Sequence, residues 1–236
     1  MIVIFASAYD ESSFSLAKRW SNQNARVLTC NDLSQPGWRW ELPLNADSAA
    51  VIGGQSISVH EIKGVLIRWP GVFEQELMHI IAEDRDYVAR EMMSFLVAWF
   101  SLLPCPVINE PTPVNLTGPA WRPEHWIYAA AQLGMAVNRS ERHVNLHSND
   151  AATNVPPITT TDVTVIGEHC FGDVEESLRD QSRQLARVAG TALLRVSFSG
   201  PHANSTFLGA DLLPQLSDEM ADAVLEHLLT REARCA

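Results

Sequence analysis

The sequence of 236 residues is poor in positive charge, and this scarcity argues against one large class of partners. It contains 17 lysines and arginines against 28 aspartates and glutamates, which gives a formal net charge of -11. Lysine occurs at only two positions, Lys18 and Lys63. Such a charge balance disfavours binding to nucleic acid or to anionic lipid headgroups. We therefore expect neither a nucleic acid nor a membrane as the main partner.

Cysteine is also scarce, and the chain has no CxxC pair among its four cysteines, Cys30, Cys105, Cys170 and Cys235. Their wide spacing favours reduced thiols over a disulfide framework or a zinc site, although a single bridge stays open. No positively charged leader precedes the first apolar run. The longest apolar run, residues 95–103, is far shorter than the roughly 20 residues that cross a bilayer. We expect a cytoplasmic protein.

Several local signatures of catalysis are missing. The first apolar run is not followed by GxGxxG, and the sequence contains no GxxxxGK[ST], GxSxG or HExxH. These absences remove the sequence basis for a Rossmann dinucleotide site, a P-loop, a serine nucleophile elbow and a zinc protease site. His143 and His147 are four residues apart, but their surroundings lack helical periodicity, so we expect surface histidines there.

The apolar pattern is that of an α/β protein, and 46% hydrophobic residues suffice for one large domain or two modest ones. The continuously apolar run 2–5 predicts a strand buried on both faces. A helix capped by Ser12 or Ser13 follows, and residues 25–29 then predict a second strand.

The next segment predicts a hairpin and the edge of a ligand site. Residues 38–42 and 48–52 predict a hairpin-like pair, with Gly53 and Gly54 as the turn before residues 55–59. Residues 65–69 predict a central strand that a Pro-Gly pair ends. Arg68 and Trp69 thus lie at the carboxyl end of that strand, where ligands bind in open parallel sheets.

The middle of the chain combines a long helix with a proline-rich segment. Apolar residues at three- and four-residue intervals predict a helix over residues 77–103. The segment 104–113 reads PCPVINEPTP, and its four prolines exclude helix and leave only Val107 and Ile108 for a strand. We expect this segment to be both a rigid crossing between two units and a wall of the site.

The second half repeats the alternation of helices and strands. A helix is predicted from Pro123 to a C-terminal glycine at Gly134. Further predicted elements are a strand at 162–166, a helix ending near Gly190, strands at 193–198 and 206–210, and a terminal helix through residues 216–228.

Arg68 is the strongest candidate ligand residue from these patterns. A guanidinium at the mouth of a sheet can form two parallel hydrogen bonds with a carboxylate or phosphate, and Arg122 could complete an anion-binding pair. The alternative is a structural ion pair of Arg68 with Glu74 or Glu76.

The run from GVLIRWPG at residues 64–71 to the sequence AQLGMAV at residues 131–137 resembles ATP-grasp ligases of the ribosomal-S6-modification and glutathione-synthetase type, including peptide-modifying ligases. In these proteins a strand ending in arginine precedes a long helix, an Asn-x-Pro turn and a helix ending AxxxGxxVP. Here Asn109-Glu110-Pro111 matches the turn. The resemblance covers residues 1–137 and is only an outline beyond them.

The resemblance also implies a loss of the nucleotide site. Ligases of this type fold several dozen residues over the nucleotide and supply lysines to its phosphates, where this chain has only the Asn/Ser/Thr/His-rich stretch 138–161. Their late strands carry an acidic residue and a Glu-x-Asn motif for Mg²⁺. The matching positions here are Ser197, Gly209 and Asp211, so Asp211 is the single metal-ligand candidate.

We therefore expect an N-terminal, open, mostly parallel α/β sheet of pre-ATP-grasp type (1–105), followed by a reduced α+β ATP-grasp remnant (106–236). The resemblance implies a non-catalytic binding or partner subunit without a cofactor, beside a biosynthetic or peptide-modifying enzyme. One alternative is an active carboxylate-amine ligase that uses ATP and Mg²⁺. Another is an α/β enzyme that binds a small molecule.

The partners implied are a partner enzyme, a peptide or small-molecule substrate, or a second copy of the chain. The ligand surface would be formed by Arg68, Trp69, Asn109, Asn115 and Arg122.

Overall fold

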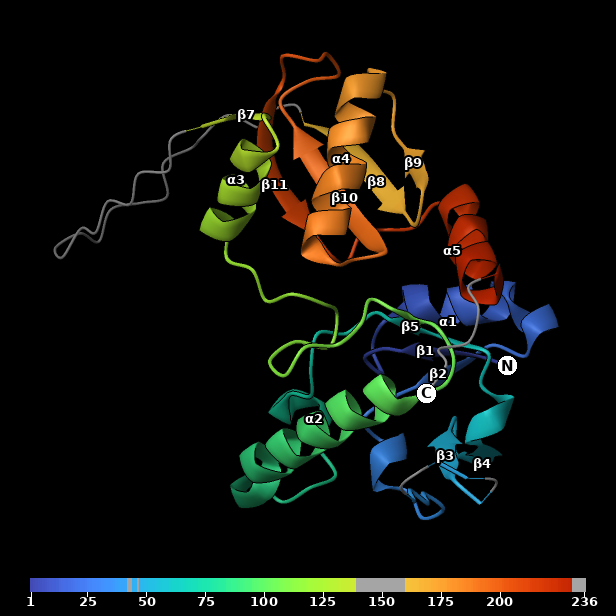
Figure 1. The fold of residues 1–236 in the computed structure, drawn as a ribbon. Coiled ribbons are helices and arrows are strands. Elements are labelled where there is room, and N and C mark those ends of the chain that lie inside the picture. Colours follow the sequence, from blue (N-terminus) through green and yellow to red (C-terminus); the bar gives the residue numbers. More distant parts are fainter. Residues whose placement is uncertain (42–43, 46, 139–159, 231–236) are drawn as a thin grey trace, which may run out of the picture. The chain divides into compact units, whose positions relative to one another are not determined.

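The computed structural model describes residues 1–41, 44–45, 47–138 and 160–230 (Figure 1). The chain forms two compact units. The first comprises Met1–Ala120 and returns with the C-terminal segment from Gln215, and the second is Trp121–Pro214. These units are not divided at the predicted 105/106 boundary. The assignment of 1–105 and 106–236 to two ATP-grasp-type domains stays a prediction.

The first unit is built on a four-stranded sheet in the order β2-β1-β5-β6. All three neighbouring pairs are parallel, as predicted, and Ile4 lies beside both Val27 and Leu66. The four strands are β1 (Ile2–Phe5), β2 (Arg26–Leu28), β5 (Gly64–Ile67) and β6 (Val107–Ile108). Because parallel strands are joined by crossovers that cover both faces, β1 is apolar throughout.

Helices cover both faces of this sheet (Figure 1). Helices α1 (Glu11–Arg19) and α5 (Asp218–Thr230) lie on one face and α2 (Arg85–Leu102) on the other. Phe5 meets Phe100 of α2 edge to face, at 5.7 Å between ring centroids. On the opposite face, a Cβ at Gly64 would come within 3.0 Å of the Leu228 side chain. Glycine thus permits the close approach of α5.

The long helix is shorter than the predicted span 77–103. Helix α2 begins at Arg85, and the preceding residues form two single turns of 3₁₀ helix, Glu74–Glu76 and Ala82–Asp84. Leu77 is buried in the same core as the helix, so apolar spacing alone did not distinguish a packed loop from a helical turn. The Arg85 Nε donates to the Ile80 carbonyl at 2.9 Å and closes this loop onto the helix start.

The predicted hairpin is formed by a different strand pair. Strands β3 (Ala49–Ile52) and β4 (Gln55–Ser58) pair antiparallel around Gly53 and Gly54, whose positive φ angles of 59° and 72° suit a tight hairpin turn. The predicted strand at 38–42 contributes only an isolated bridge from Arg39 to Ala49. Trp38 instead packs edge to face on Phe95 and Trp99 of α2.

The proline-rich segment 104–113 lies within the first unit, where it supplies the edge strand β6. The Val65 amide donates to the Pro106 carbonyl at 2.9 Å. Pro106 thus pairs with β5 through its carbonyl, and the N–H that proline lacks is not needed for this hydrogen bond. The segment is thus part of the sheet that carries Arg68.

The second unit is a five-stranded sheet in the order β7-β11-β10-β8-β9. Its pairs are antiparallel except β11 with β7. Apolar residues of one sheet face, such as Leu194 and Val196, form a core with α3 and α4. The elements are α3 (Pro123–Gln132), β7 (Ala136–Val137), β8 (Thr161–Ile166), β9 (His169–Phe171), α4 (Glu176–Ala189), β10 (Leu193–Phe198) and β11 (Thr206–Asp211). The predicted mixed α+β organisation is confirmed.

Within the described ranges, no helix has both the length and the apolar composition that a bilayer crossing requires. Among the described residues, Cys30, Cys105 and Cys170 form no disulfide. Cys235 lies outside the described residues.

Candidate functional site

Arg68 lies where predicted, directly after β5 at the carboxyl edge of the parallel sheet. Its backbone amide donates to the Phe5 carbonyl at 2.8 Å, which continues the pairing of β5 with β1 by one residue. Its side chain is partly buried. The adjacent parallel strands fix the position of Arg68 more firmly than a loop would.

The loop after β1 places a carboxylate near this guanidinium. Asp10 caps α1, and its carboxylate accepts hydrogen bonds from the amides and hydroxyls of Ser12 and Ser13. Burial opposes ionisation of Asp10, but these hydrogen bonds, aided by the Arg68 charge, outweigh it and lower its pKa. The expected cap, Ser12 or Ser13, is therefore wrong, because the longer carboxylate of Asp10 reaches the free amides of the first turn.

The Glu76 carboxylate accepts two hydrogen bonds from the same loop. The Ser7 hydroxyl donates to Glu76 Oε1 at 2.6 Å, and the Ala8 amide donates to Oε2 at 3.3 Å. Ser7 and Glu76 are both buried. Sequence reasoning considered Glu76 only as an ion-pair partner of Arg68. Its buried bonds to Ser7 and Ala8, almost 70 residues away, have no signal in local sequence.

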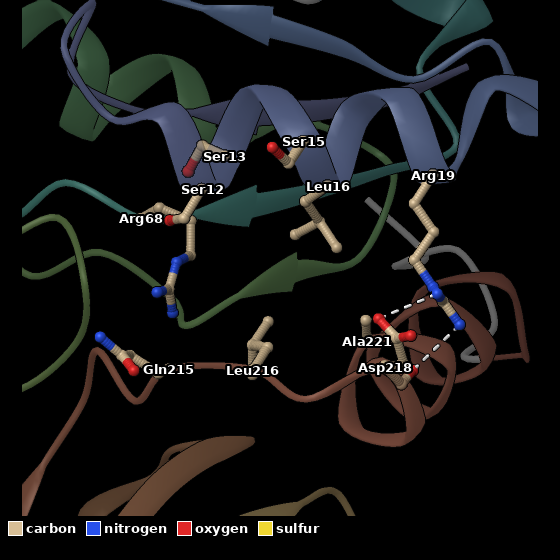
Figure 2. A pocket seen from close by; sticks show the side chains of 10 residues that line it. All are labelled: Ser12, Ser13, Ser15, Leu16, Arg19, Arg68, Gln215, Leu216, Asp218 and Ala221. Atoms are coloured by element: carbon tan, nitrogen blue, oxygen red, sulfur yellow. Dashed lines mark hydrogen bonds and ion pairs between the residues drawn. The ribbon is translucent and has the colours of Figure 1, made fainter.

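A cavity of about 440 Å³ lies between α1 and the C-terminal segment, with Arg68 at one end (Figure 2). Arg19 is at the other end, where its guanidinium bonds to both oxygens of Asp222 and to Asp218. The remaining lining residues are three serines, one glutamine and three apolar residues: Ser12, Ser13, Ser15, Gln215, Leu16, Leu216 and Ala221. The cavity offers a cation and hydroxyls beside an apolar floor, which suits a ligand that carries a carboxylate.

The other predicted ligand residues of the first unit lie in different surroundings. Trp69 is partly buried against the core and contacts Phe73 edge to face at 5.7 Å. Within the described residues, its indole Nε1 is buried without a hydrogen-bond acceptor. Asn109 follows β6 and is 2% exposed. Neither residue lines the cavity around Arg68.

Asn115 and Arg122 shape local backbone. The Asn115 side chain accepts from the amide and hydroxyl of Thr117, an arrangement that builds the turn after the proline-rich segment. Arg122 is exposed, precedes α3 and belongs to the second unit. Its part in the ligand surface stays a prediction.

The second unit contains the positions that resemble magnesium ligands, and their surroundings do not fit a divalent cation. Asp211 Oδ2 accepts from Arg195 Nη2 at 2.9 Å, and Oδ1 accepts from the Leu213 amide at 3.0 Å. The Ser197 hydroxyl donates to Asp162 at 2.6 Å. Gly209 contributes no side chain. The single acidic candidate is thus already engaged by a cation and an amide.

Sequence reasoning missed Arg195 and Asp162 because their importance depends on strand register. Arg195 lies between Asp162 and Asp211 because β10 pairs with both β8 and β11. The apolar pattern of the sequence does not show which residues of these three strands are paired. No group of three or more histidine, cysteine, aspartate or glutamate side chains among the described residues could hold a metal ion. The stretch expected to replace the nucleotide lid, with His143 and His147, falls almost entirely outside the described residues.

Comparison with known proteins identifies the fold. No protein-family model and no curated protein matches the sequence. Among solved structures, macrocyclase MdnC of Microcystis aeruginosa MRC, bound with its precursor peptide MdnA, matches with a TM-score of 0.67 and 10% identity over 97% of this chain and 99% of that chain.

Two further structures give the same result. A RiPP-associated ATP-grasp ligase of Chryseobacterium gregarium, in complex with ADP and with a leader and core peptide, has a TM-score of 0.66 and 10% identity over 96% of both chains. The ATP-grasp ligase PsnB, with a phosphomimetic minimal precursor, Mg and ADP, has a TM-score of 0.61 and 13% identity over 96% of this chain and 98% of that chain. The chain therefore has an ATP-grasp-ligase-like fold, as its resemblance to these ligases predicted.

Proposed function

We propose that this chain is a non-catalytic binding subunit with an ATP-grasp-like fold that works beside a biosynthetic, peptide-modifying enzyme. The similarity of its fold to ligases solved with precursor peptides supports a biosynthetic role and a peptide as ligand. The absence of catalysis is inferred from the chain's own residues.

The observation that carries the proposal is the engagement of Asp211. Phosphoryl transfer needs metal ions and cationic side chains to neutralise the charge that develops on the phosphates, and each lost element costs orders of magnitude in rate. Asp211 has one oxygen on the Arg195 guanidinium and the other on the Leu213 amide. A carboxylate held in this way is poorly available to Mg²⁺, which demands near-octahedral oxygen ligands.

The positions of the lysines support the same proposal. Lys18 and Lys63 are both exposed residues of the first unit. A compact nucleotide site in the second unit would thus have arginines as its only permanently charged cations. The arginines of that unit for which side-chain contacts are described, Arg179, Arg183, Arg187 and Arg195, each form an ion pair with a carboxylate.

The ligand site of this proposal is the cavity around Arg68. A peptide segment with an acidic side chain or a free carboxyl terminus would place its carboxylate on the Arg68 guanidinium and its apolar atoms against Leu16 and Leu216. Asp10 is not among the residues that line the cavity. The opposite end is closed by the ion pairs of Arg19.

Thermal unfolding with nucleotide tests the absence of an ATP site. A ligand at 100 times its Kd stabilises the folded state by about 2.7 kcal/mol, which is a shift of several degrees in Tm. We expect no Mg²⁺-dependent shift with ATP or ADP. A shift that requires both nucleotide and Mg²⁺ would refute the non-catalytic part of the proposal.

Fluorescence anisotropy with a panel of labelled peptides tests the cavity. Peptides that carry a glutamate or a free carboxyl terminus should bind more tightly than their amidated, glutamine-containing counterparts. Arg68→Ala should remove this preference, and Arg68→Lys should restore only part of it. Arg26→Ala, which changes a partly buried arginine of β2 outside the cavity, should leave the preference unchanged. Equal binding by the wild type and Arg68→Ala would remove Arg68 from the site.

The second candidate is an active carboxylate-amine ligase. It is favoured by the extent of the structural match, which spans 96% or more of this chain and of two solved ligases that contain ADP. This candidate predicts ADP release when an amine acceptor is added to chain, ATP, Mg²⁺ and a carboxylate peptide. The non-catalytic proposal predicts the same rate of ADP release as in buffer.

A further inference from the structure

A guanidinium lies between two carboxylates on one face of the second sheet. In the strand register, Arg195 on β10 is opposite Asp211 on β11, and Ser197 is opposite Asp162 on β8. Arg195 Nη2 is 2.9 Å from Asp211 Oδ2, and Nη1 is 3.9 Å from Asp162 Oδ2. One arginine thus bridges the carboxylates of both neighbouring strands.

These side chains share the face that is not packed against α3 and α4. Side chains alternate along a strand, and Leu194, Val196 and Phe198 point to the opposite face, into the core formed with these helices. Asp162 also accepts the Ser197 hydroxyl at 2.6 Å, so its orientation is fixed by a second bond. The three polar groups around the guanidinium are therefore attached to rigid backbone.

The charges of this face sum to one negative charge with Arg195 and to two without it. The two carboxylates come from strands on either side of β10 and converge on the same point, the Arg195 guanidinium. A divalent ion placed there would repel the guanidinium, since like charges a few ångströms apart disfavour each other. The guanidinium and a divalent ion are thus mutually exclusive occupants.

We propose that Arg195 is the resident cation of this face: its guanidinium takes the place of a divalent ion between Asp162 and Asp211, and its removal opens a divalent-cation site. The ligands of that site would be the two carboxylates and the Ser197 hydroxyl, an oxygen set that suits Mg²⁺ or Mn²⁺. This inference rests on the proposed non-catalytic function, and it names Arg195 as the side chain that prevents a divalent ion from binding between the two carboxylates.

Mn²⁺ binding to the full-length chain tests the inference without any nucleotide. Arg195→Met keeps the apolar stem and removes the charge. We expect it to bind one Mn²⁺ at least about 10-fold more tightly than the wild type, in line with the weak end of protein carboxylate sites. Arg195→Lys should resemble the wild type because it retains a cation, and Arg195→Met with Asp162→Asn should lose the gained affinity.

Arg183 provides the matched control. Its guanidinium also contacts two carboxylates, those of Glu176 and Asp180, but on the exposed surface of α4. Arg183→Met should not gain a Mn²⁺ site, since those carboxylates lie on one helix and do not converge from two strands. An equal gain in Arg183→Met would show that any freed pair of acids suffices and would overturn the assignment to this face.

Two other results would overturn the inference. One is a folded Arg195→Met chain, with wild-type circular dichroism, that binds Mn²⁺ no better than the wild type. The other is Mn²⁺ binding to the wild type itself, located at Asp162 and Asp211 by paramagnetic broadening, which needs no variant to fold. Either result leaves the non-catalytic proposal standing, whereas Mg²⁺-dependent ATP binding by the wild type would refute that proposal and not the cation assignment.

Discussion

Removal of the Glu76 carboxylate should destabilise the first unit more than any other single change at its carboxyl edge. Glu76 accepts from the Ser7 hydroxyl and the Ala8 amide, and both Ser7 and Glu76 are more than nine-tenths buried. In Glu76→Ala both donors lose their acceptor. A buried donor left without a partner costs about 1–3 kcal/mol. The Ala8 amide is only partly buried and should add less than the buried Ser7 hydroxyl, so we expect a total loss of about 2–4 kcal/mol.

The conservative variant should give a smaller effect. Glu76→Gln retains one oxygen acceptor and nearly the same volume, so about 1–2 kcal/mol should be lost. Urea unfolding monitored by tryptophan fluorescence measures these changes, because five of the seven tryptophans, Trp20, Trp38, Trp40, Trp69 and Trp99, belong to the first unit. Because the chain has two units, the transition is analysed with circular dichroism in parallel.

Glu74→Ala is the matched control, since Glu74 is an exposed carboxylate in the same 3₁₀ turn as Glu76. It should change the free energy of unfolding by less than about 0.5 kcal/mol. The account of the β1 loop would be refuted if Glu76→Ala were as mild as Glu74→Ala. It would also be refuted if Glu76→Ala were destabilising but left the loop at residues 7–9 as resistant to proteolysis as in the wild type.

Two further predictions concern titratable groups of the same edge. Asp10→Ala should lower the free energy of unfolding by about 1 kcal/mol, because it removes the cap of α1. Because the folded-state pKa of Asp10 is lowered, this difference between the variant and the wild type should hold above about pH 4 and shrink as the pH falls further. Burial, with the nearby charge of Glu76, raises the pKa of the Cys30 thiol to about 12 in the folded chain. The neutral thiol therefore contributes stability that is fully present below the unfolded-state pKa and is lost as the pH rises through the folded-state pKa. Urea titrations at several alkaline pH values should therefore show a shallower decline for Cys30→Ala than for the wild type, by on the order of 1 kcal/mol per pH unit above about pH 9; parallel curves would contradict the buried thiol.

The parallel sheet of the first unit was predictable because its strands are continuously apolar. Residues 2–5 have no polar position, which only a strand covered on both faces tolerates. The position of Arg68 followed from the Pro-Gly pair at residues 70–71, which lies shortly after the end of β5 at Ile67. Likewise, Pro123 at the start of α3 and Gly190 at the end of α4 are local signals with a direct steric meaning.

The remaining features depend on contacts between residues distant in sequence. Leu77 has the apolar spacing of the helix that follows, yet it packs from a loop. The bond from Ser7 to Glu76 and the bridge from Asp162 to Asp211 through Arg195 require a known crossover and a known register, which no local pattern supplies. The candidate metal position at Asp211 was identified from the sequence, but its occupation by a guanidinium was not.

The measurement that tests the central claim most directly is calorimetric titration of the full-length chain with ATP in the presence and absence of Mg²⁺. Because Asp211 is engaged by Arg195 and the Leu213 amide, we predict no saturable heat that depends on Mg²⁺. Saturable, Mg²⁺-dependent binding of ATP with one site per chain would contradict the account, and ADP release on addition of an amine acceptor would establish the ligase instead.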